Sequence, residues 1–270
     1  MYKDLEHLAR DPSLKTLNSV PKDEIYLWKK TWGHSFIKEN FFTDTELSWL
    51  EDLMYRRHIE RRVKKNGTLH FFVDIQKIKK KFFSKLKLVI PELEDCDWQG
   101  NFLITSTPYN LHIDTGVQEN FTNSVPGKQI IIPLWVCHTN KNKNVDPECG
   151  TAVFKNRFIM YGTNFAKSDE MYDTNVFYTI RNYKNLKTYN KNGSKKNNDW
   201  NKEFDVDLYK KYFSHFKKEW LDGFELENIF NWKRGNLIVF DRCQAHCGIN
   251  FLKNYVTLKA GLSLMTTVSK

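Results

Sequence analysis

The chain has 270 residues, of which 40% are hydrophobic and 15% aromatic, and its 42 basic and 32 acidic residues give a formal net charge of +10. This length and apolar content can bury the core of one catalytic domain, which excludes an intrinsically disordered chain. No apolar run approaches the roughly 20 residues that span a bilayer, and the first residues lack the apolar stretch of a signal peptide, so we expect one cytoplasmic domain over residues 1–270.

Residues 1–95 are predicted to form helices and supporting strands that brace a β-sheet. Residues 1–16 and about 43–60 carry helical periodicity, and Thr43 or Asp44 can cap the second of these helices. Residues 74–89 predict a further helix, whose apolar residues recur at steps of three and four.

Strand-like segments begin at residue 98. Residues 98–105 read as a strand that leads into a turn at 108–110, and residues 129–136 form a nearly continuous apolar run of strand length. Residues 150–154 follow a polar turn and read as another strand. The first block of the predicted β core therefore covers residues 98–155.

Residues 155–233 are predicted to be a long insertion of loop and helix. Its stretch 182–201 is rich in asparagine and lysine and reads as a mobile loop. Residues 205–221 read as an amphipathic helix, whose aromatic stripe is more often core packing than a ligand site. An insertion at this place could act as a lid over a site.

The second block of the β core covers residues 234–266. Residues 234–241 form an apolar strand with His246 just beyond it, and residues 256–265 form the closing strand. Lys259 lies on this closing strand, 13 positions after His246.

The most informative motif is His112-Ile113-Asp114, which His246 follows 134 positions later. Residues two apart on a strand point to the same face, so His112 and Asp114 can reach one metal ion together. Two imidazoles and one carboxylate form the facial triad of non-haem Fe(II) oxygenases. Each residue taken alone also fits an ordinary structural role: a turn cap for His112, an Asp-Thr-Gly turn for Asp114 and a buried hydrogen-bonded imidazole for His246.

In the order of these motifs, the chain resembles the Fe(II)/2-oxoglutarate-dependent oxygenase superfamily. The resemblance implies an α+β fold with a mainly β core, a double-stranded β-helix of the jelly-roll or cupin-like type, flanked by N-terminal helices and carrying the long insertion. It also implies that His112, Asp114 and His246 bind Fe(II), with 2-oxoglutarate and O₂ as cosubstrates.

The resemblance places the anchor for the distal carboxylate of 2-oxoglutarate at Lys259. Many relatives have Arg-x-Ser at this point, whereas this chain has Lys259-Ala260-Gly261, so the anchor is a point charge rather than a planar fork. Thr257 and Ser263 share a strand face with Lys259 in a regular strand, and either could supply the hydroxyl partner. Asn101 resembles the amide residue that some relatives place near the keto-acid end, and Arg242 is the next choice for the anchor.

The implied reaction is oxidative decarboxylation of 2-oxoglutarate to succinate and CO₂, coupled to hydroxylation of a substrate C–H bond. Desaturation and cyclisation use the same chemistry. The favoured substrate is a small molecule, including amino-acid-like metabolites. The alternatives are a peptidyl side chain or a nucleic-acid base, and a non-catalytic binding module that kept the fold.

The cysteines and the basic residues could form two further sites, but for each a simpler interpretation is preferred. The odd number of cysteines and the absence of a secretion signal favour reduced thiols, and Cys243-x-x-x-Cys247 lacks the Cys-x-x-Cys spacing and second pair of a structural zinc site. The basic runs at residues 56–65 and 77–87 could attract nucleic acid, but a solvated helix face is the simpler interpretation because no nucleic-acid-binding motif accompanies them. The sequence does not define the oligomeric state.

Overall fold

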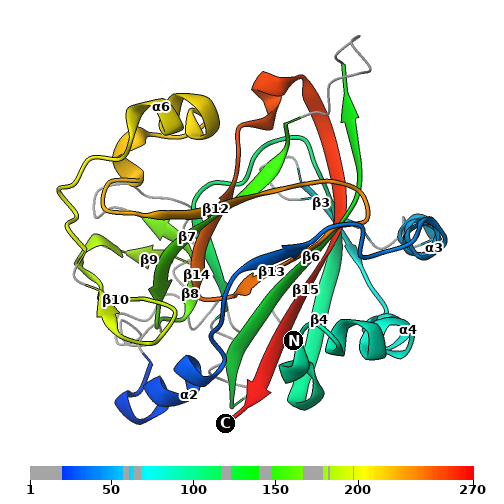
Figure 1. Ribbon diagram of the computed structural model, residues 1–270, viewed down its shortest axis with the longest axis horizontal. Helices are drawn as coiled ribbons and strands as arrows, with labels where there is room; N and C mark the ends of the chain where they lie inside the picture. Colours follow the sequence, from blue (N-terminus) through cyan, green and yellow to red (C-terminus); the bar gives the residue numbers. More distant parts are fainter. Residues whose placement is uncertain are drawn as a thin grey trace.

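The structure is a computed structural model in which two antiparallel β-sheets face one another, with short helices around them (Figure 1). It describes residues 20–56, 61–63, 68–116, 123–139, 148–166, 179–181, 183–196 and 198–270.

The larger sheet has the strand order β1-β13-β6-β15-β4-β3-β2. Its strands have the following bounds: β1 Phe36–Lys38, β2 Arg61–Val63, β3 Thr68–Phe72, β4 Cys96–Thr105, β6 Ser124–His138, β13 Leu237–Asp241 and β15 Val256–Ser269. The long strand β15 lies between β4 and β6 and is antiparallel to both.

The second sheet has the order β11-β10-β7-β14-β5-β8-β9, and β12 also pairs with β7. Its strands have the following bounds: β5 His112–Thr115, β7 Gly150–Phe158, β8 Gly162–Ala166, β9 Thr179–Arg181, β10 Thr188–Tyr189, β11 Lys195–Lys196, β12 Leu226–Asn231 and β14 Gln244–Gly248. Only the short β8–β9 pair is parallel among the pairs of described strands.

Eight of these strands form the double-stranded β-helix that the sequence predicts. In chain order, β4, β6, β13 and β15 lie in the larger sheet, whereas β5, β7, β12 and β14 lie in the second sheet. The chain alternates between the sheets up to β7, turns back through the antiparallel β7–β12 pair, and alternates again to β15. This winding is that of a two-sheet jelly roll.

Helices α3 (Asp44–Arg56) and α4 (Ile75–Lys87) cover the outer face of the larger sheet, beside β4 and β15 (Figure 1). Both were predicted within a few residues. Thr43 and Glu46 form a capping box, because the Thr43 amide donates to the Glu46 carboxylate at 2.8 Å and the Glu46 amide donates to Thr43 Oγ1 at 3.3 Å. At α4, the Asp74 side chain is the N-cap and accepts from the Lys77 amide at 3.4 Å.

The remaining helical segments are short. Helix α2 spans Ile25–Lys30, and 3₁₀ turns occur at Lys22–Glu24, Pro91–Asp95, Tyr183–Asn185, Lys218–Trp220 and Phe251–Asn254. The helix predicted over residues 1–16 lies outside the described residues. No helix in the described part of the chain is long and apolar enough to cross a membrane.

The insertion differs from its prediction in two ways. Strand β7 continues to Phe158 and β12 pairs back onto it, so both ends of the segment 155–233 belong to the core. The predicted helix 205–221 is interrupted: α6 spans only Val206–Leu208, a π-helical turn covers Tyr209–Phe213, and an extended residue precedes the 3₁₀ turn at Lys218–Trp220.

Tertiary packing explains this interruption. The aromatic residues of the segment insert into a cluster on the outer face of the second sheet, and the amide of Asn250 donates to the Tyr212 carbonyl at 2.6 Å. One straight helix would present these aromatic side chains along a single stripe, whereas the cluster surrounds them.

Within the predicted loop 182–201, β10 and β11 form an antiparallel pair.

The space between the sheets holds a separate cluster, to which both sheets contribute. Phe102 of β4 and Leu262 of β15 pack outward beneath α3 and α4. Because side chains alternate along a strand, Lys259, Ser263 and Asn101 lie on the inner face, toward the second sheet. This inner space, the lumen of the β-helix, is where the candidate site lies.

Candidate metal centre

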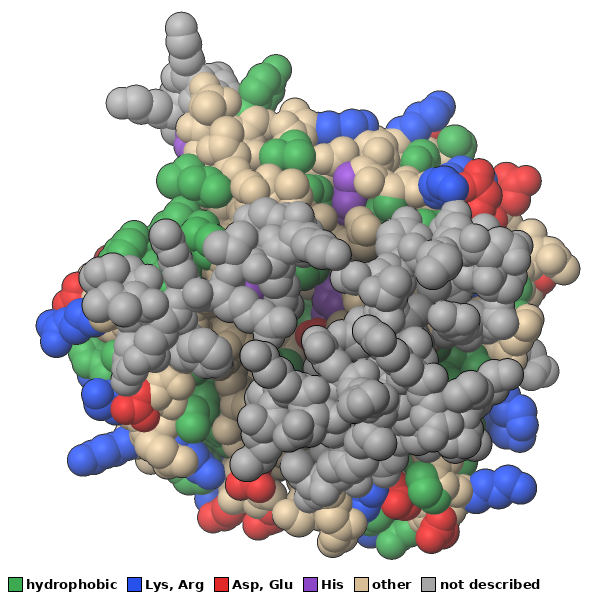
Figure 2. Space-filling model, turned by 180° about the vertical axis from the view of Figure 1, so that it is seen from behind, with side chains coloured by type: hydrophobic (Ala, Val, Ile, Leu, Met, Phe, Trp, Pro, Cys, Tyr) green, Lys and Arg blue, Asp and Glu red, His purple; other side chains and the backbone are tan. Residues whose placement is uncertain are grey.

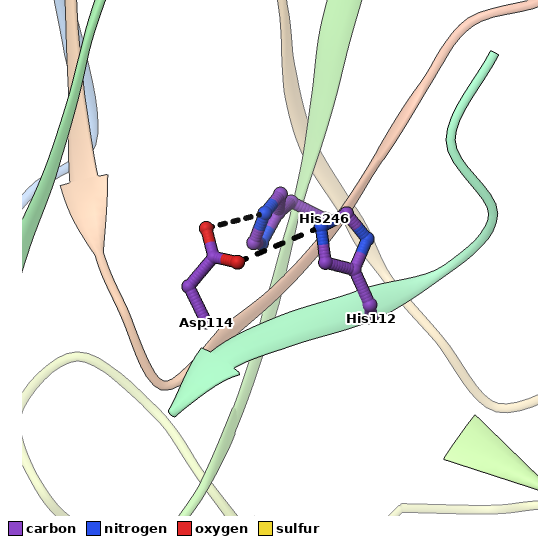
Figure 3. Close-up of side chains that lie close together, drawn as sticks. All are labelled: His112, Asp114 and His246. Atoms are coloured by element: carbon purple, nitrogen blue, oxygen red, sulfur yellow. Dashed lines mark ion pairs between the residues drawn. The ribbon is translucent and has the colours of Figure 1, made fainter. Parts of the chain in front are cut away.

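The three predicted metal ligands converge in the lumen. His112 and Asp114 extend from β5, and His246 lies directly opposite His112 on the neighbouring strand β14. His112 Nε2 is 3.7 Å from one Asp114 oxygen, and His246 Nε2 is 3.2 Å from the other (Figure 3). One ligand atom from each residue lies within 4.8 Å of the others, and no other group of this kind occurs among the described residues.

Backbone carbonyls set the orientation of both imidazoles. His112 Nδ1 is 2.7 Å from the Asn110 carbonyl, and His246 Nδ1 is 2.9 Å from the Gln244 carbonyl. A carbonyl only accepts, so Nδ1 carries the proton in each ring and the lone pair of a neutral ring is on Nε2. Both lone pairs therefore face the Asp114 carboxylate, and this donor set fits a divalent metal ion that accepts imidazole and carboxylate ligands, as Fe(II) does.

Arg242 fixes the backbone of Asp114. The Asp114 amide donates to the Arg242 carbonyl at 2.8 Å, and Arg242 Nε donates to the Asp114 carbonyl at 2.8 Å. Burial alone would raise the pKa of the Asp114 carboxyl, but His246, His112 and Arg242 together hold the pKa well below its usual range. The carboxylate is therefore ionised at neutral pH and available as a ligand.

The centre lies below the molecular surface but is not sealed. Exposed side-chain fractions are 14% for His112, 20% for Asp114 and 5% for His246. The ring of Phe240 supports His246, with centroids 4.6 Å apart. Figure 2 shows histidine and acidic side chains recessed near the middle of one face of the molecule. Because His112 and Asp114 are partly exposed, a ligand can approach the metal position from this side.

Lys259 lies in the lumen as a buried cation. It is 4% exposed, and its Nζ lies 4.0 Å from the centroid of the Trp232 ring and 5.2 Å from that of Phe251. Among the described residues no carboxylate pairs with it. Burial lowers the pKa of Lys259 below its ordinary value. A buried ammonium group without an anionic partner is an electrostatic site for an anion.

The three predicted polar neighbours of Lys259 have different positions. Ser263 and Asn101 are paired across β15 and β4 on the inner face, and the Gln129 amide donates to Ser263 Oγ at 2.5 Å. Thr257 is exposed and its hydroxyl faces the Cys137 carbonyl at 3.4 Å. The expectation that Thr257 shares the face of Lys259 fails, because the pairing of β15 with β6 shifts register next to Thr257.

Arg242, the other anchor considered, is used within the protein. Besides the Asp114 carbonyl, its guanidinium donates to the Thr266 carbonyl at 3.1 Å. These bonds make Arg242 a positioning residue for Asp114.

A set of polar groups around Tyr109, beside the triad, was not predicted from the sequence. The Tyr109 ring lies 5.6 Å from the ring of His112, and its hydroxyl lies 3.2 Å from His70 Nε2. The Tyr109 carbonyl lies 3.4 Å from Nε2 of His215, which comes from the insertion. Tyr109 could have been found from its place three residues before His112, but no local signal distinguishes His70 or His215.

Among these polar groups, His215 is a neutral hydrogen-bond acceptor. Burial, opposed by the bond to Tyr109 and reinforced by the charge of Lys259, lowers the pKa of His215 to about 4. Because the Tyr109 carbonyl accepts from Nε2, Nδ1 carries the lone pair, and it is buried without a partner among the described residues.

The two cysteines around His246 are separated by the fold. Cys243 packs with Trp28 and Tyr161, whereas Cys247 belongs to the cluster beneath the insertion. Burial raises the pKa of both thiols well above the usual range. A neutral thiol in an apolar cluster is a packing residue, so a shared zinc site is not formed here.

No known family model and no curated protein matches the sequence. Among solved structures, the chain is similar to a prolyl-4-hydroxylase from Pseudomonas putida, with 10% identity, coverage of 91% of this chain and 100% of that chain, and a TM-score of 0.45. It is also similar to HygX from Streptomyces hygroscopicus, solved with nickel, 2-oxoglutarate and hygromycin B, with 10% identity, coverage of 93% and 88%, and a TM-score of 0.44. A third similar structure is the epimerase SnoN in complex with Fe3+, alpha ketoglutarate and nogalamycin RO, with 10% identity, coverage of 96% and 85%, and a TM-score of 0.46.

Proposed function

We propose that this protein is an Fe(II)- and 2-oxoglutarate-dependent dioxygenase that hydroxylates, or otherwise oxidises, a C–H bond of a small molecule with release of succinate and CO₂. The observation that carries the proposal is the combination of two features in one lumen. These are the His112–Asp114–His246 cluster and the buried Lys259, with which no carboxylate of the described residues pairs. A metal centre alone fits many reactions. A metal centre with a separate buried cation fits a dicarboxylate that chelates the metal with one end and pairs with the cation through the other.

His112, Asp114 and His246 would hold the ion, and their three ligand atoms leave coordination positions open. Fe(II) in such a facial triad supplies the activation of O₂ that is coupled to decarboxylation of a bound 2-oxo acid. The protein orients the ligands through the carbonyls of Asn110 and Gln244.

Lys259 would bind the distal carboxylate of 2-oxoglutarate. The ammonium group would gain an ion pair in a site from which most water is excluded, where such a contact is stronger than at the surface. The pair formed by Gln129 and Ser263, with Asn101 beside it, offers further polar contacts on the same inner face. Thr257 is not part of this proposal, because it lies at the surface.

The polar groups around Tyr109 favour a small polar substrate. Tyr109 lies beside His112 of the triad, and His70 and His215, from separate parts of the chain, contact its hydroxyl and its carbonyl. Nδ1 of His215 is buried and has no partner among the described residues, so we propose that a hydroxyl or amino group of such a substrate donates to it.

A nucleic-acid substrate is less well supported. Lys79, Lys81 and Lys85 of α4 lie over aromatic rings, and Lys85 also pairs with Glu46 at 2.6 Å. On the face shown in Figure 2, basic side chains are dispersed at the edge among acidic ones and do not gather in one patch. This distribution is that of a solvated surface rather than a phosphate-binding groove.

An anaerobic absorbance titration of the Fe(II) protein with 2-oxoglutarate tests the proposal. We expect a visible charge-transfer band in the wild type and in a control variant, His34→Ala, whose exposed histidine lies away from the lumen. The band should be absent from His246→Ala. Bound iron without a band in the wild type would indicate another cosubstrate, and loss of iron binding altogether would indicate a non-catalytic module. A subsequent screen for substrate-dependent succinate formation would identify the substrate class.

A further inference from the structure

Trp232 connects the end of β12 to the closing strand β15. Its backbone amide donates to the Cys149 carbonyl at 2.7 Å, and its indole Nε1 donates to the Ala260 carbonyl at 3.3 Å. The side chain is 5% exposed. These two bonds fix both the position and the tilt of the indole within the lumen.

Gly261 makes room for the indole. A Cβ atom at Gly261 would lie 2.6 Å from Cζ2 of Trp232, a distance that no real side chain tolerates. The ring can therefore lie against β15 only because residue 261 is a glycine. The consequence is that the ring face is presented to Lys259, two residues earlier on the same strand.

The Trp232 ring is the main described contact of the Lys259 ammonium group. The distance of 4.0 Å from Nζ to the ring centroid is well inside the range of a cation–π contact, and tryptophan is the strongest aromatic partner for a cation. Of the two predicted hydroxyl partners, Ser263 accepts from Gln129 and Thr257 lies at the surface. An aromatic face thus occupies the place where a hydroxyl partner was expected.

We propose that Trp232 determines the cosubstrate specificity of this site by holding the Lys259 ammonium group charged and in place for the distal carboxylate of a five-carbon 2-oxo dicarboxylic acid. This inference rests on the proposed function. A cation–π contact stabilises the ammonium group without neutralising it, so Lys259 stays available to an incoming carboxylate. An acidic partner in the same position would instead compete with the cosubstrate. Trp232 acts through Lys259 and is therefore a positioning residue.

The test compares two ligands in four proteins by anaerobic titration of the Fe(II) form. The ligands are 2-oxoglutarate and 2-oxopentanoate, which has the same carbon chain but no distal carboxylate. The proteins are the wild type, Trp232→Leu, Trp232→Phe and the control Trp98→Leu. Trp98 is a matched control, because it is a buried tryptophan of the neighbouring strand β4 with a lysine over its ring, but it packs outside the lumen.

We expect Trp232→Leu to weaken 2-oxoglutarate about tenfold, a loss in the range of a desolvated cation–π contact, while 2-oxopentanoate binds as in the wild type. Trp232→Phe should lose about threefold, because a smaller ring without the indole is a weaker partner. Trp98→Leu should change neither ligand.

Equal weakening of both ligands by Trp232→Leu would overturn the inference, because it would indicate general loss of packing. Unchanged 2-oxoglutarate affinity would overturn it as well. If Trp232→Leu does not fold, Trp232→Phe decides, because a wild-type preference for the dicarboxylate in that variant contradicts the proposed role of the indole. Failure of the proposed function is distinguishable, because the wild type would then give no band with 2-oxoglutarate at all.

Discussion

At the scale of single residues, the same kind of hydrogen bond orients the two imidazoles that we propose as metal ligands. Each donates its Nδ1 proton to the carbonyl two residues earlier in the chain, Asn110 for His112 and Gln244 for His246. The orientation of each ring is therefore set by residues next to it in the chain. The pairing of β5 with β14 only has to bring the two rings together, with centroids 4.1 Å apart.

Lys259→Ala should weaken 2-oxoglutarate much more than iron. The substitution removes a buried cation whose charge-assisted contact with a carboxylate is worth about 1.5–3 kcal/mol, or roughly 10- to 150-fold in affinity. Titrations with Fe(II) and then with 2-oxoglutarate measure the two affinities separately. Lys253→Ala, an exposed lysine on the preceding turn, is the control. Unchanged cosubstrate affinity in Lys259→Ala would move the anchor elsewhere.

His215 should make folding stability depend on pH in a defined window. Its pKa is lowered to about 4 in the folded protein from an ordinary value near 6.5, so the unfolded chain binds a proton at higher pH than the folded protein. The contribution of the neutral ring to stability is complete above about pH 6.5 and is lost as the pH falls toward 4.

Denaturant unfolding of the wild type and of His215→Asn at several pH values measures this effect. The wild type should lose stability relative to the variant between pH 6.5 and 4. Parallel curves over this window would show that His215 titrates normally in the folded protein.

At the scale of secondary-structure elements, the flanking helices stabilise the sheet that carries Lys259. Phe82 of α4 is 1% exposed and lies edge-on to the rings of Phe42 and Trp49. Its neighbour Phe83 is only half-buried. The helices are therefore part of the core, and their lysines form the outer rim.

Phe82→Ala should lower the free energy of unfolding by about 3–5 kcal/mol, because it removes a buried ring and leaves a cavity. Phe83→Ala, the half-buried neighbour, should cost clearly less. Urea unfolding of both variants checks the difference, and iron binding by the folded fraction should be unchanged in each. Equal costs would mean that α4 packs with a different face.

The elements also differ in how far local sequence predicts them. Helices α3 and α4 follow their apolar periodicity and their capping residues, Thr43 and Asp74. The segment 205–221 has a similar periodicity but is broken into short turns, because it packs against the second sheet on several sides. Periodicity predicts a helix where one face is buried, and fails where surrounding contacts replace helical hydrogen bonds.

At the scale of the whole molecule, a buried ion network ties the two sheets to the N-terminal segment. The Asp241 carboxylate of β13 accepts from Lys128 Nζ and Arg157 Nε, each at 2.7 Å, and from the Gly33 amide at 3.2 Å. Arg157 also bonds the Gln244 side chain at 3.1 Å. Four elements distant in the sequence thus meet at one carboxylate.

Asp241→Asn should destabilise the whole domain by about 3–5 kcal/mol, because it leaves the buried Arg157 without its anion and leaves Lys128 with only Glu92, 3.4 Å away. The exposed Asp97 supplies the control variant Asp97→Asn, which should cost little. Thermal and urea unfolding measure both changes. A cost near zero for Asp241→Asn would indicate that solvent reaches this network. Since Gln244 precedes His246 by two residues, iron affinity of the variant reports whether the network also supports the metal centre.

The sequence by itself determined strands β4, β6, β7, β13 and β15 in outline, helices α3 and α4, and the three residues that meet at the candidate metal centre. The strands, the helices and the His112-Ile113-Asp114 motif depend on strand alternation and helical periodicity, which are local, whereas His246 was assigned from the order of the motifs and the family resemblance. The tertiary structure alone decided the contacts around Lys259 and the triad. Trp232 lies over the ammonium group, Gln129 donates to Ser263, Tyr109 lies beside His112 with His215 at its carbonyl, and a register shift turns Thr257 to the surface. These contacts join residues up to 134 positions apart across different strands, and register and packing between distant strands are properties that no local pattern encodes.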